Sequence, residues 1–232
     1  MKHRYYYQKL HPSLLGVYDS FYHAHSCRAA RIDGQALTPP QINELLHLIL
    51  LDHPQLCHFE GKWGYSNGIV PVYTLTLQQT QALSAAVADL LRLLPIPAPS
   101  DSETTVRIIY DWFLSHVVYD PYAPRSQSSY GALVECRAAC KGISKGFQLL
   151  LHTLDIPCIL VEGTLDDQMK HVWNMVNING QWTHVDICMG YPQFYSLTNA
   201  KDPYSCFFES THTLQNSHRI HHSHLLPTEV PI

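Results

Sequence analysis

The sequence predicts an α+β fold, in which helices come first and an antiparallel sheet follows a late helix. Apolar residues recur at helical spacing in four segments before residue 155, and the period changes to two after residue 158. Asn179-Gly180 separates two of the alternating runs, which is a strong signal for a β-hairpin. We therefore expect a helix packed on an antiparallel sheet, preceded by a helical N-terminal extension.

Three helices are expected ahead of the last one, and each starts with a Ser or Thr followed three residues later by Gln or Glu. This spacing forms a capping box, in which the two residues satisfy each other's backbone N–H groups. The boxes begin at Thr38, Thr76 and Ser100. The first helix should end at Asp52-His53-Pro54, since proline cannot continue a helix.

The segment Ile96-Pro97-Ala98-Pro99 indicates a short linker between the second and third helices. We therefore expect two domains. Residues 1–99 should form an N-terminal extension of helices and strands, and residues 100–232 a core domain with an irregular tail that begins near Tyr191.

The core domain should contain a helix that begins near Cys140 and ends before Pro157. Strands are expected at Cys158–Gly163, Val172–Ile178 and Gln181–Cys188. A two-residue turn then pairs Ile178 with Gln181 and fixes the register of the hairpin. One face of the hairpin carries the aliphatic side chains that must form the core, from Val172, Val176, Ile178, Val185 and Ile187.

The opposite face of the hairpin carries polar and aromatic side chains. In this register Trp173 lies opposite Asp186, and His171 is the diagonal neighbour of Asp186, within reach of a long side chain. His184 shares this face. A slip of one residue would separate the imidazole from the carboxylate.

Cys140 lies in the first turn of its helix, where free backbone N–H groups and the helix dipole stabilise a thiolate. A thiolate nucleophile also needs a base and a group that orients the base. His171 and Asp186 supply both, so the chain order of the predicted triad is Cys, His, Asp.

The segment from about Tyr130 to Ile187 resembles the transglutaminase-like superfamily, in particular its bacterial members. The matching blocks are Tyr130-Gly-Ala-Leu133, Cys140-x-Gly142, Phe147-x-Leu-Leu150, His171-Val-Trp-Asn-Met-Val176 and Gly180-Gln-Trp-x-His-Val-Asp186. The resemblance implies a papain-like transglutaminase core, with Cys140 as nucleophile, His171 as general base and acid, and Asp186 as the orienting residue. The sequence departs from the family at Ala138, where glycine is common, and at Ile187-Cys188, where Thr-Trp is frequent.

Several residues compete for these roles or could assist them. Cys136 is a rival nucleophile that ranks lower because it precedes the helix, and His184 is a rival base. Cys188 is expected to pack near the site. For substrate binding we name Trp173, as a groove wall, and Tyr130, as a guess for the side chain that completes the oxyanion hole.

The tail contains His218, His221, His222 and His224, four histidines within seven residues. They could bind zinc or nickel, but their spacing suits no standard structural site. We expect a solvated, mobile tail, and the sequence implies neither a metal nor a cofactor.

The sequence thus predicts a thiol enzyme that acts on peptide or protein amide bonds through a thioester. It is either a cysteine protease or amidase, or a protein-glutamine acyltransferase. The alternative is an inactive peptide-binding module that keeps the fold.

Composition excludes several other classes of protein. The net charge of −4 comes without a basic stripe, which argues against nucleic acid as a partner. No apolar run is long enough to span a membrane. Seven unpaired cysteines without an export signal indicate free thiols and a cytoplasmic location, with secretion by an unconventional route as the alternative. The oligomeric state is not predicted.

Overall fold

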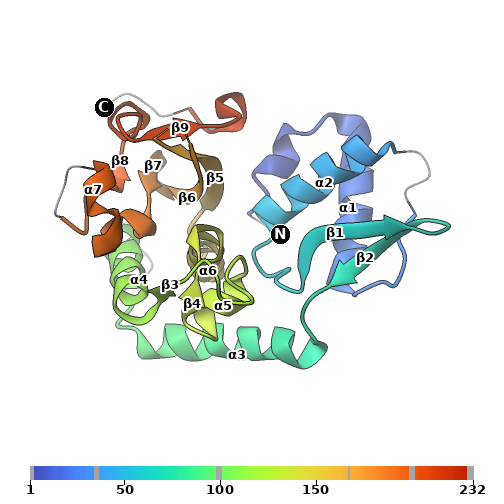
Figure 1. Cartoon of the computed structure of the whole chain (residues 1–232), viewed down its shortest axis with the longest axis horizontal. Coiled ribbons are helices and arrows are strands. Elements are labelled where there is room, and N and C mark those ends of the chain that lie inside the picture. Colours follow the sequence, from blue (N-terminus) through green and yellow to red (C-terminus); the bar gives the residue numbers. More distant parts are fainter. Residues whose placement is uncertain (1–2, 34–36, 98–100, 167, 199–201, 229–232) are drawn as a thin grey trace. The chain divides into compact units, whose positions relative to one another are not determined.

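The computed structural model describes residues 3–33, 37–97, 101–166, 168–198 and 202–228 (Figure 1). The chain divides into two compact units, Met1–Gln81 and Ala82–Ile232. The boundary expected between residues 99 and 100 stays a prediction. Among the described residues, no helix has both the length and the apolar character that crossing a bilayer requires.

The first unit combines helices with a two-stranded sheet. The Thr38 capping box is confirmed, because the Thr38 N–H donates to Gln41 Oε1 at 2.9 Å and the helix ends at Asp52 as expected. The elements are η1 (Tyr6–Lys9), α1 (Pro12–Ser26), α2 (Pro39–Asp52), β1 (Phe59–Tyr65) and β2 (Ile69–Tyr73). The two strands are antiparallel neighbours.

Helix α3 (Leu77–Leu93) starts in the first unit and continues in the second. Its capping box is confirmed, with Thr76 N–H donating to Gln79 Oε1 at 2.9 Å and Gln79 N–H to Thr76 Oγ1 at 3.2 Å. The expected cap of the next helix is wrong by one residue. Helix α4 (Ser102–His116) is capped by Asp101, whose carboxylate accepts from Thr104 N–H. Ser100 lies outside the described residues.

The second unit is built around a five-stranded antiparallel sheet with strand order β8-β7-β6-β5-β9 (Figure 1). Its central strands β5, β6 and β7 confirm the three expected strands in type and order. The elements that follow α4 are β3 (Val118–Tyr119), α5 (Ser129–Leu133), β4 (Arg137–Ala138), α6 (Cys140–Thr153), β5 (Cys158–Leu165), β6 (Met169–Ile178), β7 (Gln181–Val185), η2 (Ile187–Gly190), η3 (Pro192–Phe194), α7 (Tyr195–Thr198), β8 (Phe207–Glu209), α8 (Thr211–Leu214), β9 (His218–Ile220) and η4 (Ser223–Leu225).

Helix α6 packs on the sheet, as the fold class predicts. The Ser144 hydroxyl donates to the carbonyl of Val172 at 3.0 Å, and the Asn174 side chain donates to the carbonyl of Ser144 at 3.1 Å. A Cβ at Gly142 would overlap with the carbonyl oxygen of Ser126, so only glycine lets the first turn of α6 approach this loop.

The hairpin register is confirmed, with Ile178 paired to Gln181 and Met175 to His184. Asn179 and Gly180 both have positive φ, at 52° and 91°, as a type I′ turn requires. Both faces of the hairpin are buried, and not only the aliphatic one. Trp173 and His184 are both fully buried, and His184 Nε2 lies 2.9 Å from Thr211 Oγ1 of α8.

The last predicted strand ends earlier than expected. Strand β7 stops at Val185, and Asp186 becomes the N-cap of the 3-10 helix η2. The Asp186 Oδ1 atom accepts a hydrogen bond from Cys188 N–H at 2.9 Å. This local cap competes with the strand ladder, which is why the alternating pattern of the sequence extends beyond the real strand.

The expectation of an irregular, solvated tail is wrong for part of the C-terminal segment. Strand β9 pairs with β5, and its first residue, His218, is fully buried. The N–H of His221 donates to the carbonyl of Glu162 and extends this pairing. His222 and His224 are exposed, as expected.

Candidate active site

The first turn of α6 presents Cys140 to a pocket. Cys140 is half-buried and follows Ala139, whose N–H is held by the carbonyl of Ser126 at 2.9 Å. Helix α6 is amphipathic and 14 residues long, so its dipole and its free N-terminal N–H groups point at the thiol. The position therefore favours an anionic sulfur or a bound anion.

His171 lies near the start of β6 and is only 3% exposed. Its Nε2 atom lies 2.6 Å from Asp186 Oδ2, and its ring also hydrogen-bonds to the Cys140 thiol. Because Nε2 is used by Asp186, Nδ1 is the nitrogen left for the sulfur. The structure thus brings the three predicted residues together from a helix, a strand and the end of a hairpin.

The electrostatics of this group favour an ion pair. Burial alone would lower the pKa of His171, but the Asp186 carboxylate and the Cys140 thiol outweigh it and raise the pKa to about 10. Burial would raise the pKa of Asp186, but His171 and His218 hold it well below its usual range. Both shifts favour an imidazolium paired with a carboxylate at neutral pH.

Asp186 has more partners than the sequence predicts. Besides His171 and the Cys188 N–H, its Oδ2 atom lies 2.9 Å from Nε2 of His218. Sequence reasoning missed His218 because it assigned all tail histidines to solvent. A possible signal is the short alternation His218-Arg219-Ile220, but three residues are too few to predict a strand.

The rivals of the predicted residues have other surroundings. His184 accepts from Trp173 Nε1 at 3.0 Å, and burial lowers the pKa of His184 to about 4, so it stays neutral. Burial raises the pKa of the Cys136 thiol. Trp173 is fully buried and stacks on His171, with 5.9 Å between the ring centroids. Tyr130 is a buried residue of α5. Substrate binding by Trp173 and Tyr130 stays a prediction.

Cys188 lies beside the imidazole and the carboxylate. Its sulfur, the Asp186 carboxylate and a ring nitrogen of His171 all lie within 4.8 Å of one another and are buried. Burial raises the pKa of the Cys188 thiol well above its usual value, and Asp186 and Cys140 add to the effect. Such a donor set could hold Zn²⁺, but only if the metal replaced the hydrogen bond between Asp186 and His171. The absence of a metal stays a prediction.

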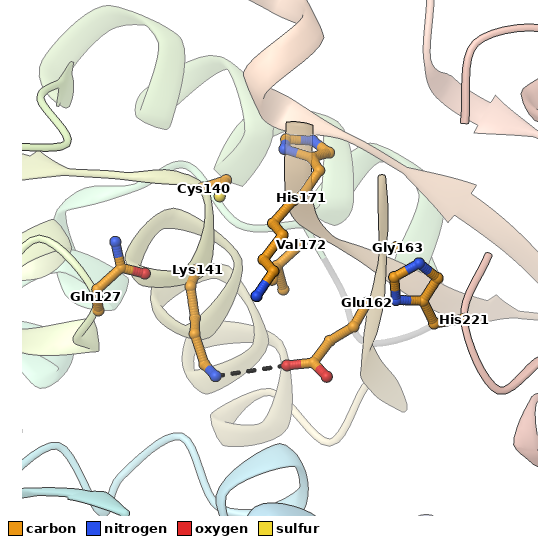
Figure 2. Close-up of a pocket in the computed structure, with 9 residues that line it drawn as sticks. Gln127, Cys140, Lys141, Glu162, Gly163, His171, Val172 and His221 are labelled. Carbon is orange, nitrogen blue, oxygen red and sulfur yellow. Dashed lines mark hydrogen bonds and ion pairs between the residues drawn. The ribbon is translucent and has the colours of Figure 1, made fainter. Parts of the chain in front are cut away.

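The pocket beside Cys140 has a volume of about 450 Å³. In Figure 2, Cys140 and His171 lie next to each other, and an ion pair of 3.4 Å joins Lys141 to Glu162 across the pocket. Lys141 lies in the first turn of α6 and Glu162 on β5, and sequence reasoning did not predict that they pair. The lining residues are Gln127, Cys140, Lys141, Glu162, Gly163, Lys170, His171, Val172 and His221.

The comparison with protein-family models matches part of the second unit. Residues 95–187 match the model of the transglutaminase-like superfamily, which supports a transglutaminase-like core in this part of the chain. The match includes Cys140, His171 and Asp186. The comparison with curated proteins gives no match.

Some solved structures are similar over part of the chain. A TGase shares 14% identity at a TM-score of 0.40, covering 54% of this chain and 43% of that one. A protein of Cytophaga hutchinsonii, provisionally named a cysteine protease, shares 21% sequence identity with this chain at a TM-score of 0.37. The match covers 47% of this chain and 37% of that one. Menin, described with its binding site for the Mixed Lineage Leukemia (MLL) protein, shares 13% sequence identity at a TM-score of 0.35. The match covers 74% of this chain and 34% of that one. This chain thus spans less than half the length of each.

Proposed function

We propose that the protein is a thiol enzyme that cleaves or transfers acyl groups at peptide or protein amide bonds. The observation that carries this proposal is the contact of Cys140, His171 and Asp186 beside an open pocket. A buried imidazolium next to a sulfur favours the thiolate, which is the nucleophilic form. The transglutaminase-like core is consistent with this chemistry.

In the proposed reaction the sulfur of Cys140 attacks the carbonyl carbon of the amide. The tetrahedral intermediate collapses when the C–N bond breaks, and His171 gives its proton to the leaving nitrogen. The product is a thioester on Cys140. Water or a primary amine then attacks the thioester, His171 takes the proton of the attacking group, and the sulfur leaves.

The start of α6 contributes to the same steps. Backbone N–H groups in the first turn of a helix have no partner within the helix, so they can stabilise the negative oxygen of the intermediate. Asp186 keeps the imidazole of His171 oriented toward the sulfur. Acyl transfer to an amine and hydrolysis use the same three residues, and they differ in how well the thioester excludes water.

The proposal is tested by mass spectrometry of reaction mixtures. Wild-type protein is incubated with glutamine-containing peptides, with and without a primary amine, beside Cys140→Ala and the control Cys27→Ala, which removes an exposed thiol in the first unit. A peptide joined to the amine indicates acyl transfer, and cleavage or deamidation indicates hydrolysis. Either product should disappear in Cys140→Ala and persist in Cys27→Ala.

The contrary outcome is equally clear. If neither product forms, the reactivity of the thiol decides between the wrong substrate and an inactive site. Iodoacetamide at mildly acidic pH should label Cys140 faster than the exposed Cys27. Equal, slow labelling of both thiols would contradict the enzyme and favour a peptide-binding module.

A further inference from the structure

A second imidazole contacts the orienting carboxylate of the site. Asp186 Oδ2 lies 2.6 Å from Nε2 of His171 and 2.9 Å from Nε2 of His218. Both histidines and the carboxylate are nine-tenths or more buried. A carboxylate only accepts hydrogen bonds, so Nε2 of His218 must carry a hydrogen that it donates to Asp186.

The ring of His218 is fixed at its other nitrogen as well. Nδ1 lies 2.8 Å from the hydroxyl of Ser217, which can donate to it when the ring is neutral. The ring also meets Trp173 edge-on, with 4.9 Å between the centroids, and Trp173 in turn stacks on His171. Two hydrogen bonds and an aromatic contact therefore leave His218 a single orientation.

The fold brings His218 to this place through a close approach of two strands. Strand β9 pairs with β5 from Gly163↔Ile220 to Leu165↔His218. A Cβ at Gly163 would overlap with the carbonyl oxygen of Arg219, so glycine is required where β9 meets the wall of the pocket. The site is thus completed by a strand 32 residues beyond Asp186.

We propose that His218 is a positioning residue, which holds Asp186 in the rotamer that orients His171 toward Cys140. His218 donates its Nε2–H to Oδ2 of Asp186, and the N–H of Cys188 donates to Oδ1. Together these two hydrogen bonds fix the plane of the Asp186 carboxylate. Without His218, the carboxylate could rotate away from His171, because one of its two anchors would be lost. This inference rests on the function proposed above and deepens it.

The titratable groups that face His218 include Asp186, His171 and His184. His218 supports the ionised form of Asp186, and Asp186 supports the imidazolium of His171. Removal of His218 should therefore shift the pH dependence of Cys140 reactivity as well as its rate. A residue that only fills space would leave that pH dependence unchanged.

The test compares His218→Leu, which removes the donor, with His218→Gln, whose amide can still donate to Asp186. His224→Leu is the matched control, an exposed histidine of the same segment. Turnover and the rate of Cys140 alkylation by iodoacetamide are measured from pH 5 to 10, with circular dichroism to check folding. We expect His218→Leu to lower kcat by roughly 10- to 100-fold with KM nearly unchanged, because orientation of the acid–base group is lost.

The conservative variant separates positioning from packing. His218→Gln should retain kcat and the labelling profile within about threefold, since its hydrogen bond is kept. If His218→Leu does not fold, Ser217→Ala, which removes only the hydroxyl at Nδ1, should still shift the labelling profile. In an Asp186→Asn background, His218→Leu should have no further effect on rate.

The inference is overturned if folded His218→Leu keeps the wild-type kcat and labelling profile. It is also overturned if His218→Gln and His218→Leu lower kcat and change the labelling profile to the same extent. Failure of the proposed function looks different. In that case the wild-type protein itself shows neither turnover nor preferential labelling of Cys140, whatever residue stands at position 218.

Discussion

Cys140, His171 and Asp186 come from three segments with separate structural reasons for their positions. The sulfur lies at a helix N-terminus, the imidazole on a strand, and the carboxylate at the cap of a 3-10 helix. Because the last two are almost fully buried, their charges interact strongly and each stabilises the other's ionised form. A single substitution of His171 or Asp186 should therefore change the protonation of its partner as well as the geometry of the site.

Asp186→Asn tests that coupling through the pH dependence of the reaction. The carboxylate raises the pKa of His171 to about 10, so the wild-type protein should keep its imidazolium, the proton donor, far into the alkaline range. In Asp186→Asn the alkaline limb of kcat/KM should move down toward neutral pH, and kcat should fall by roughly 10²- to 10⁴-fold.

The measurement is a pH–rate profile of both proteins with the same peptide. An alkaline limb at the same pH in wild type and Asp186→Asn would contradict the assignment of the carboxylate as the group that raises the pKa of His171.

At the scale of elements, the start of α6 depends on the close packing of its first turn. The Cys140-x-Gly142 spacing has a steric reason, since the chain from Ser126 to Ser128 passes directly over Gly142. The hairpin β6–β7 has an equally local reason, the positive φ angles of Asn179 and Gly180. Both features position the predicted triad through backbone geometry rather than through side-chain contacts.

Gly142→Ala tests the packing of α6. The added methyl group would overlap with backbone oxygen atoms, so we expect a loss of about 1–3 kcal/mol of stability. Gly16→Ala is the matched control, an exposed glycine within α1 with no atom near its missing Cβ. It should gain about 0.5–1 kcal/mol, because alanine favours helix.

Urea unfolding followed by circular dichroism measures both changes. Equal stability of Gly142→Ala and wild type would show that the loop over α6 can move aside, and that the close packing is not required.

At the scale of the whole molecule, the chain forms two compact units, and the predicted triad lies entirely in the second. The charges of His171 and Asp186 should make the stability of that unit depend on pH. The folded pKa of Asp186 is lowered, so its contribution is present above pH 4 and is lost as the solution becomes more acidic. The folded pKa of His171 is raised, so its contribution is present below pH 6.5 and is lost toward pH 10.

The stability advantage of wild type over Asp186→Asn should therefore be largest between about pH 4 and 6.5. It should shrink by more than about 1.4 kcal/mol, the equivalent of one pKa unit, by pH 10. Trp63→Phe removes the one tryptophan of the first unit, so fluorescence in that background reports urea unfolding of the second. An advantage that stays constant from pH 5 to 10 would argue against the buried ion pair.

The sequence by itself determined the features whose cause is local. Capping boxes at Thr38 and Thr76, the turn at Asn179-Gly180 and the α6 start at Cys140 follow from a few neighbouring residues, and the structure has them where expected. The hairpin register followed from the turn. It predicted that His171 and Asp186 lie together.

Only the tertiary structure decided what lies around these groups. The contact of His218 with Asp186, the polar pocket and the burial of both hairpin faces depend on segments distant in the chain. Strand β9 has three residues, too few for a periodic pattern, and it is a strand only because β5 offers it hydrogen-bond partners. Such pairing is a property of the assembled sheet, because its energy comes from contacts that no short window of sequence contains.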